Sequence, residues 1–267
     1  MNDETQPPVE AGLDVEHGPK LASGRDADVY DLGNGRVLRR NTVRTKTSEY
    51  EAEVMRFVGA WGYPVPAVHA VSGPDMVMDR VDGPTMLNDL GTRPWMLRRH
   101  ARTLAKLHRQ LHGIPAPDWV PTYASHPAFV TPDADTTSPT PIQSAEAGPV
   151  IPDALLHLDL HPDNVILSPS GPVVIDWRNT RRGDGAIDVA STWLIMATSA
   201  VPDTSLRWRV IELVRRLFVA EILRHVDRPA AERQLPFVAR YRLADRNLLD
   251  RERPAIHALL RRTGASL

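Results

Sequence analysis

The sequence predicts an α+β fold in two parts: a small N-terminal antiparallel sheet with one helix, then a larger, mainly helical part. Two observations predict it. Short β-prone segments joined by turns fill residues 20–82, and one helical segment interrupts them. After Gly83-Pro84, apolar residues recur at helical spacing instead. With 267 residues, the chain is long enough to bury a substantial core.

The first elements of the N-terminal part are expected to form a β-hairpin. The segment DADVYDLG alternates, and Gly33-Asn34-Gly35 provides a turn before the second strand, RVLRR. Asn-Gly between short β-prone segments is a strong hairpin signal. Residues 1–18 are expected to form a flexible tail ahead of this hairpin.

One helix and two further extended segments complete the N-terminal lobe, residues 19–82. Ser48–Ala60 has Ala52, Met55 and Val58 on one face, which predicts a helix. The prolines of YPVPAVHAV exclude a helix there, and DMVMDRV is typical of a strand. A hinge is expected near Asp79–Gly83.

Residues 83–267 are expected to form the helical C-terminal lobe. Leu97 to Leu111 has an apolar stripe that includes Leu104 and His108, with basic residues opposite. Residues 113–152 hold 9 of the 24 prolines and predict a long surface loop. Further helices are expected from about Ala186 to the end.

Polar residues flank a predicted hairpin in LLHLDLHPDNVILSPSGPVVIDWRNT. Asp159 and Asn164 precede its first strand, and Asp176 follows its second. Because a hairpin returns the chain to its starting edge, we expect these three side chains to meet in one pocket. Two carboxylates and an amide oxygen suit Mg²⁺, which phosphates and water usually complete. The segment therefore predicts a nucleotide site.

The motif His157-x-Asp159-x-x-x-x-Asn164, followed by Ile175-Asp176-Trp177, resembles the catalytic and metal-binding loops of the aminoglycoside phosphotransferase family. These proteins are small-molecule kinases of the protein-kinase-like superfamily, and the resemblance covers about residues 20–250. It implies a two-lobe protein-kinase-like fold. It also implies Mg²⁺-dependent transfer of the γ-phosphoryl group of ATP or GTP to a hydroxyl of a small molecule.

Roles follow from the resemblance for five residues. Asp159 matches the catalytic Asp, which accepts the hydroxyl proton or orients the hydroxyl. Asn164 and Asp176 match the Mg²⁺ ligands. His157 and Asp188 match residues that support the catalytic loop.

The nucleotide side departs from the family pattern. Arg39 stands where the family usually has a lysine, and Glu51 is its expected partner. The phosphate loop, SGRDADVY, has one glycine instead of three. Ser23, Gly24 and Asp79 are the other expected nucleotide-binding residues. These departures leave open an alternative, a non-catalytic kinase-like module that binds a small molecule or a protein.

Two further alternatives are weaker. The H-x-D-x-H spacing at residues 157–161 is compatible with a metal hydrolase, but Pro162 ends the strand and no other His-rich motif adds ligands. From Val201 onward the chain has 14 basic and 8 acidic residues. We favour a solvated helix face over nucleic-acid binding, because no aromatic interleaving or known binding motif accompanies the arginines. The same charge favours a neutral or anionic acceptor over a polycationic one.

The composition of the chain excludes several other classes of protein. A formal net charge of −1 and 42% apolar residues exclude a disordered chain and a highly charged nucleic-acid wrapper. The chain has no cysteine, which excludes disulfides and a thiol nucleophile. Without a long apolar run or a signal-peptide pattern, we expect a cytoplasmic protein with no membrane contact. The acceptor's identity and the oligomeric state stay open.

Overall fold

The computed structural model describes residues 12–24, 26–43, 46–125, 153–199, 206–244 and 248–265. The chain divides into two compact units. The first contains the residues up to Pro84 together with Ile166–Arg178, and the second contains Thr85–Val165 and the residues from Asn179 onward. The chain therefore enters the first unit a second time, two residues after Asn164. The predicted α+β class is confirmed in these two units.

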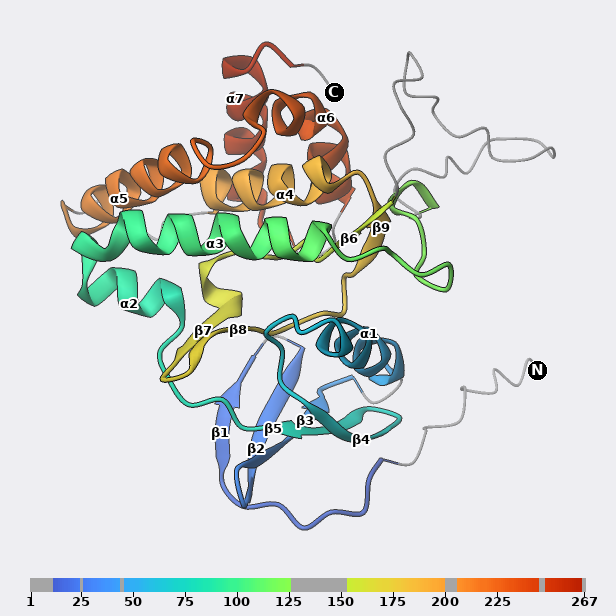
Figure 1. Cartoon of the computed structure of the whole chain (residues 1–267). Coiled ribbons are helices and arrows are strands. Elements are labelled where there is room, and N and C mark those ends of the chain that lie inside the picture. The colour runs from blue at the N-terminus through green and yellow to red at the C-terminus, as the bar shows by residue number, and fades with distance from the viewer. Residues whose placement is uncertain are drawn as a thin grey trace, which may run out of the picture. The chain divides into compact units, whose positions relative to one another are not determined.

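The first unit contains a five-stranded antiparallel sheet of order β1-β2-β3-β5-β4 (Figure 1). Its strands are β1 (Lys20–Ser23), β2 (Ala27–Gly33), β3 (Arg36–Asn41), β4 (Val68–Ser72) and β5 (Asp75–Asp79). Gly33, Asn34 and Gly35 all have positive φ angles, of 71°, 50° and 71°. Glycine and asparagine tolerate this backbone region, and the predicted β2–β3 hairpin is confirmed.

Helix α1 (Glu49–Ala60) belongs to the same unit and contacts β4. Ala52, Met55 and Val58 are buried along it, as their spacing predicts. Leu38 of β3 and Met76 of β5 are fully buried in the sheet. Burial of apolar side chains from both helix and sheet gives the first unit its core.

A hairpin from later in the sequence completes the first unit. Strands β7 (Val165–Ser168) and β8 (Gly171–Val174) pair, as predicted. The Leu167 amide donates to the Pro84 carbonyl at 2.9 Å. A Cβ atom at Gly83 would lie 2.2 Å from the Leu167 carbonyl oxygen, so the close approach requires glycine there. After the hairpin, the buried Trp177 ring meets Tyr63 edge-on, with 5.4 Å between ring centroids.

The second unit is mainly helical. Its helices are α2 (Met86–Thr92), α3 (Leu97–His112), α4 (Gly185–Thr198), α5 (Leu206–Ile222), α6 (Arg228–Ala244) and α7 (Arg253–Arg262). Helix α4 contacts α3, α5, α6 and α7, and most of its side chains are buried (Figure 1). Strands β6 (Ala154–Leu156) and β9 (Arg181–Gly183) form a short antiparallel pair. A helix that is apolar on nearly all sides fits this central position.

Two predicted irregular segments lie largely outside the described residues. Of the predicted tail, residues 12–18 are described and contain no helix or strand. Of the proline-rich loop, residues 113–125 and Asp153 are described, with a short 3₁₀ turn at Tyr123–Ser125. Among the helices described, none is both long and apolar enough to cross a lipid bilayer.

Candidate active site

The catalytic loop predicted from the sequence lies in the second unit, between β6 and β7. Strand β6 ends at Leu156, and the buried His157 follows it. Leu158 has a φ angle of 65°, in the left-handed region that costs a leucine free energy. The His157 Nδ1 atom accepts a hydrogen bond from the Asp159 amide at 3.3 Å. His157 therefore holds the backbone of the loop at Asp159.

The Asp159 carboxylate is held by one group on each oxygen. The Asn164 Nδ2 atom donates to Oδ2 at 3.0 Å. The His161 Nε2 atom lies 3.3 Å from Oδ1. Because His161 Nδ1 accepts from the Asp163 amide at 3.3 Å, the proton of a neutral His161 is on Nε2, facing the carboxylate.

Three kinds of interaction act on the pKa of Asp159. Burial raises it, but the hydrogen bond and charge of His161, the charge of His157 and the hydrogen bond from Asn164 lower it by more. The pKa therefore lies below its ordinary value. Asp159 is a carboxylate at neutral pH and can only accept hydrogen bonds.

The Asn164 amide has a defined orientation. Its Nδ2 atom also donates to the Asp159 carbonyl oxygen, at 2.9 Å. Since both neighbours are acceptors, the nitrogen must face them, and Oδ1 points away. Within the described part of the chain, no hydrogen bond to that oxygen is found. Asn164 thus presents an oxygen that is suitable as a metal ligand.

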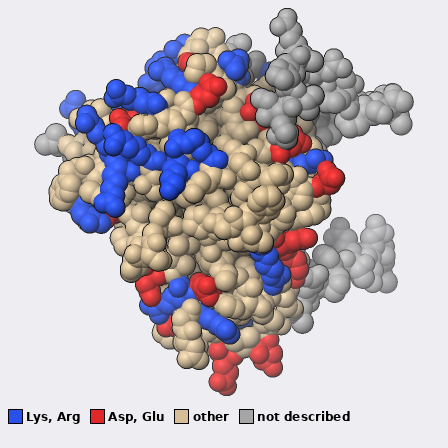
Figure 2. All heavy atoms as spheres, in the orientation of Figure 1, with Lys and Arg blue, Asp and Glu red and all other residues tan. Residues whose placement is uncertain are grey.

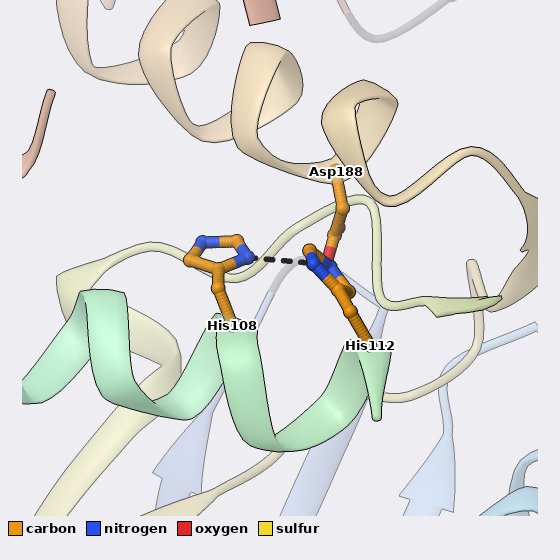
Figure 3. A group of neighbouring side chains, drawn as sticks. All are labelled: His108, His112 and Asp188. Atoms are coloured by element: carbon orange, nitrogen blue, oxygen red, sulfur yellow. Dashed lines mark hydrogen bonds and ion pairs between the residues drawn. The ribbon is translucent and has the colours of Figure 1, made fainter. Parts of the chain in front are cut away.

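Asp188 of α4 contacts the loop that contains Asp159. It is fully buried, and its Oδ1 atom accepts the Leu158 amide at 2.6 Å. Figure 3 shows His108 and His112 of α3 pointing toward this carboxylate; His112 Nε2 lies 3.1 Å and His108 Nδ1 3.3 Å from Oδ2. Burial raises the pKa of Asp188, but its interactions with the two histidines lower it to well below the ordinary value. Asp188 is therefore ionised, and it stabilises the left-handed Leu158.

Thr192, one turn further along α4, makes a second contact with the loop. Its hydroxyl donates to the Leu160 carbonyl at 2.7 Å. That hydroxyl has one proton, so it accepts from His108 Nε2, which lies 3.1 Å away. Burial is the main influence on His108 and lowers its pKa. Asp188 and Thr192 together fix the backbone on both sides of Asp159.

The same cluster has the composition of a metal site. Donor atoms of His108, His112 and Asp188 lie within 4.8 Å of one another. The contacts of Asp188 and Thr192 with the loop explain this clustering without an ion. Among the described residues, the side chains of the H-x-D-x-H motif form no such cluster.

The first unit contains the predicted ion pair. Arg39 on β3 and Glu51 on α1 are 2.9 Å apart, with side chains only 9% and 5% exposed. Burial raises the pKa of Glu51, and the Arg39 charge opposes this shift. Arg40 points to the other face of the sheet, where it forms two hydrogen bonds to Asp75, at 2.7 and 2.8 Å. Of the two neighbouring arginines, Arg39 is thus the one that faces α1, as the two-residue period of a strand predicts.

Asp176 lies in the same unit, just after β8. Its φ angle is 67°, and its side chain is 38% exposed. Arg39 and Arg178 approach Oδ1, at 3.5 and 3.3 Å. No contact to Oδ2 is found within the described part of the chain, so this oxygen is also suitable as a metal ligand. The sequence does not single out Arg178, although it stands only two residues after Asp176.

The other residues predicted to bind the nucleotide make local contacts within the first unit. The Ser23 hydroxyl donates to Asp28 at 2.5 Å, and the Gly24 amide donates to the Ala27 carbonyl at 2.8 Å. Asp79 interacts with the His69 ring at 2.6 Å. The Ser23 hydroxyl and the Gly24 amide are therefore already used within the turn.

Several solved structures share the fold of this chain. The crystal structure of aminoglycoside phosphotransferase APH(4)-Ia superposes with a TM-score of 0.60 and 16% identity, over 93% of this chain and 94% of that one. The gentamicin–APH(2")-IIa complex gives 0.56 and 15%, over 93% and 91%. A choline/ethanolamine kinase family protein from Mesorhizobium loti gives 0.56 and 18%, over 92% and 87%. The predicted protein-kinase-like fold is thereby confirmed.

The sequence itself places the chain within this class. A family model described as the phosphotransferase enzyme family, APH, matches residues 17–213. The chain belongs to this family, and the family resemblance drawn from the sequence is confirmed. A comparison with curated proteins finds no match.

Proposed function

We propose that the chain is a Mg²⁺-dependent kinase that transfers the γ-phosphoryl group of ATP or GTP to a hydroxyl of a small molecule. The observation that carries this proposal is the Asp159 carboxylate, ionised and held by His161 and Asn164. Family membership supports phosphoryl transfer. Among the similar structures, one is described as a ternary complex with AMP-PNP and hygromycin B, and another as one with ATP and streptomycin.

Asp159 would orient the acceptor. A carboxylate that only accepts hydrogen bonds binds the acceptor hydroxyl through its proton and aims the oxygen at the phosphorus. Because the pKa of Asp159 is lowered, it is a weak base, and orientation is its main contribution. This fits phosphoryl transfer, whose transition state needs little removal of the hydroxyl proton before bond formation.

Asn164 and Asp176 would hold the metal. Each presents one oxygen that has no partner among the described residues, and both are the hard ligands that Mg²⁺ prefers. When bound, Mg²⁺ neutralises charge on the nucleotide phosphates. The contacts of Asp176 with Arg39 and Arg178 would hold its carboxylate in place for this purpose.

Arg39 would replace the usual lysine on the nucleotide side. Its fork is divided between Glu51 and Asp176, so its proposed role is to position Asp176 and to add positive charge near the phosphates. Ser23, Gly24 and Asp79 remain proposed nucleotide-binding residues. Because the Ser23 hydroxyl and the Gly24 amide already have partners, neither group is expected to be the main phosphate donor.

Asp159→Asn tests the proposal. The variant should lower kcat by about 10²- to 10⁴-fold, the usual contribution of a positioned acid or base, while nucleotide affinity survives. Activity is measured with ATP and GTP over a panel of small-molecule alcohols, and affinity by thermal shift with and without Mg²⁺. Asp163→Asn is the matched control, since Asp163 is exposed in the same loop and accepts from the Thr85 hydroxyl. Full activity of Asp159→Asn would refute the role given to Asp159.

The non-catalytic alternative has one supporting observation. The turn after β1 has one glycine, and its amide is used internally by Ala27, so this loop offers fewer free donors to phosphates than the family pattern. A binding module of this kind would show no thermal shift with either nucleotide and no transfer to any acceptor. A Mg²⁺-dependent shift with ATP or GTP would favour the kinase.

A further inference from the structure

A cavity of about 730 Å³ opens in the second unit, and α4, α5 and α7 contribute most of its walls. Neither Asp159 nor Asn164 lines it. Its floor includes Trp193 and Met196 of α4 and Val219 of α5, all largely buried. Pockets for small organic ligands have this size and such an apolar lining.

The charged part of the lining is mostly cationic. Among the lining residues that the structure describes, there is one carboxylate, Glu212, and there are six arginines: Arg215, Arg216, Arg224, Arg228, Arg251 and Arg262. Glu212 is already paired with both Arg215 and Arg216. The cavity therefore has a large positive excess. Figure 2 shows Lys and Arg side chains gathered on the same unit, over α3, α5 and α7.

The positive charges of four of these arginines are weakly paired or unpaired with carboxylates of the described residues. Arg224 lies 3.6 Å from Glu221 and Arg228 lies 3.8 Å from Glu232, both near the limit of an ion pair. Arg251 and Arg262 are exposed, and neither has an ion-pair partner among the residues that the structure describes. Their guanidinium groups are available to an anion.

Two further features of the arginines are typical of an anion-binding site. The Arg228 guanidinium lies 5.9 Å from the centre of the Trp193 ring, an arrangement that holds the cation at the aromatic floor. Arg215 is only 17% exposed, and its buried Nε atom has no hydrogen-bond acceptor among the residues placed in the structure. A bound oxyanion would supply an acceptor to such a group.

We propose that this cavity binds an organic anion, with its carboxylate or phosphate held by the arginines and its apolar body against Trp193. Arginine suits this role because its planar fork forms two parallel hydrogen bonds to one oxyanion. A polycation would meet like charge in the same cavity and is excluded as its ligand. The proposal does not depend on the phosphotransfer chemistry, because none of the proposed catalytic residues lines the cavity.

The cavity is linked to the catalytic loop through α4. Trp193 directly follows Thr192, whose hydroxyl holds the Leu160 carbonyl beside Asp159. Because no proposed catalytic residue lines the cavity, a phosphoryl acceptor bound here would have to extend beyond it to reach Asp159, whereas a separate effector would stay within it. An acceptor and an effector would share the same chemistry, an oxyanion on an apolar body. A probe that also carries a hydroxyl group distinguishes the two, because only an acceptor is phosphorylated.

Calorimetry with the full chain and 6-hydroxy-2-naphthoate tests the proposal. The probe should bind at one site, whereas 2-naphthol and 2-naphthylmethylamine should bind at least about tenfold more weakly, since they lack the charge-assisted hydrogen bonds. Inorganic phosphate, which lacks the apolar body, should also bind more weakly. Phosphorylation of the probe by Mg²⁺ and ATP, read by mass spectrometry, would identify an acceptor, and binding without phosphorylation would identify an effector.

Arginine variants locate the probe. Arg251→Gln/Arg262→Gln should weaken binding by about tenfold or more, whereas Arg240→Gln on the exposed side of α6 should leave it unchanged. All three side chains are exposed, so the thermal midpoint should stay the same. The proposal is overturned if the naphthoate does not bind, if the amine binds as tightly, if the double variant binds like wild type, or if Mg²⁺ and ATP displace the probe competitively.

Discussion

Replacing Asp188 by asparagine removes the charge beneath the catalytic loop and keeps the side-chain shape. In the wild-type chain, Oδ1 accepts the Leu158 amide at 2.6 Å and Oδ2 faces His112 Nε2 at 3.1 Å. Asparagine can keep the acceptor for Leu158. Its amide nitrogen then faces His112 Nε2, which is also a donor because it pairs with a carboxylate in the wild type. The hydrogen bond with His112 is lost and two donors meet there, although the amide can donate to His108 Nδ1, which carries no proton when Nε2 donates to Thr192.

The expected cost follows from the burial of Asp188. It is fully buried, and removing one member of a buried charged network costs about 3 to 5 kcal/mol. Because the contact with Leu158 is retained, we expect a loss at the lower end of this range, about 3 kcal/mol in the free energy of unfolding. Urea unfolding at pH 7 measures it. Asp184→Asn is the matched control on the same helix. Asp184 is the exposed N-cap of α4, and asparagine caps equally well. Its second oxygen accepts from Gln234 in an exposed contact, which contributes little, so the cost should stay below about 0.5 kcal/mol.

The pH dependence provides a second test. Because the pKa of Asp188 is lowered in the folded chain, its stabilising contribution is complete above the unfolded pKa of about 4. It is lost as the pH falls below that value toward the folded pKa. The stability difference between wild type and Asp188→Asn should therefore be constant from pH 8 to about 5 and shrink below pH 4. A loss under about 1 kcal/mol at pH 7, or a difference that is unchanged at pH 3, would refute the explanation.

Two variants of the first unit follow from its contacts. Arg39→Met leaves the buried Glu51 without its cation and should lower the free energy of unfolding by about 3 to 5 kcal/mol. Arg39→Lys should cost less, because an ammonium still pairs with Glu51. Equal losses of the two variants in urea would contradict the ion-pair explanation. Ser23→Ala should change the KM for the nucleotide by less than about twofold, because the hydroxyl donates to Asp28, and a rise of about tenfold would show instead that it reaches the phosphates.

Local patterns were sufficient for most secondary-structure elements and for the Arg39–Glu51 ion pair. The Gly-Asn-Gly turn and the Ser-Pro-Ser-Gly turn each predict a hairpin, and the structure has both. The side of β3 that Arg39 occupies follows from the two-residue period of a strand. The position of Glu51 follows from the helical face that it shares with Met55. These are short-range rules, and they apply here because the turns and periods are regular.

The contacts that support these residues depend on long-range packing, which no local pattern contains. The hairpin that precedes Asp176 joins the first unit because Gly83 permits a close backbone approach and Trp177 packs on Tyr63. Thr192 is an ordinary helix residue in the sequence, yet its hydroxyl holds the catalytic loop. The Gly24 amide is taken by Ala27 within its own turn, a contact that depends on the exact path of the backbone. Sequence patterns identify the residue types of a site better than the hydrogen bonds they form.

Metal affinity tests most directly whether Asn164 and Asp176 are the ligands that accompany the nucleotide. Electron paramagnetic resonance of Mn²⁺ with the ATP complex measures it for wild type, Asn164→Ala, Asp176→Ala and the loop control Asp163→Ala. We expect each ligand variant to weaken Mn²⁺ binding by about tenfold or more and the control to match wild type. Wild-type Mn²⁺ affinity in either Asn164→Ala or Asp176→Ala would contradict the proposed metal site.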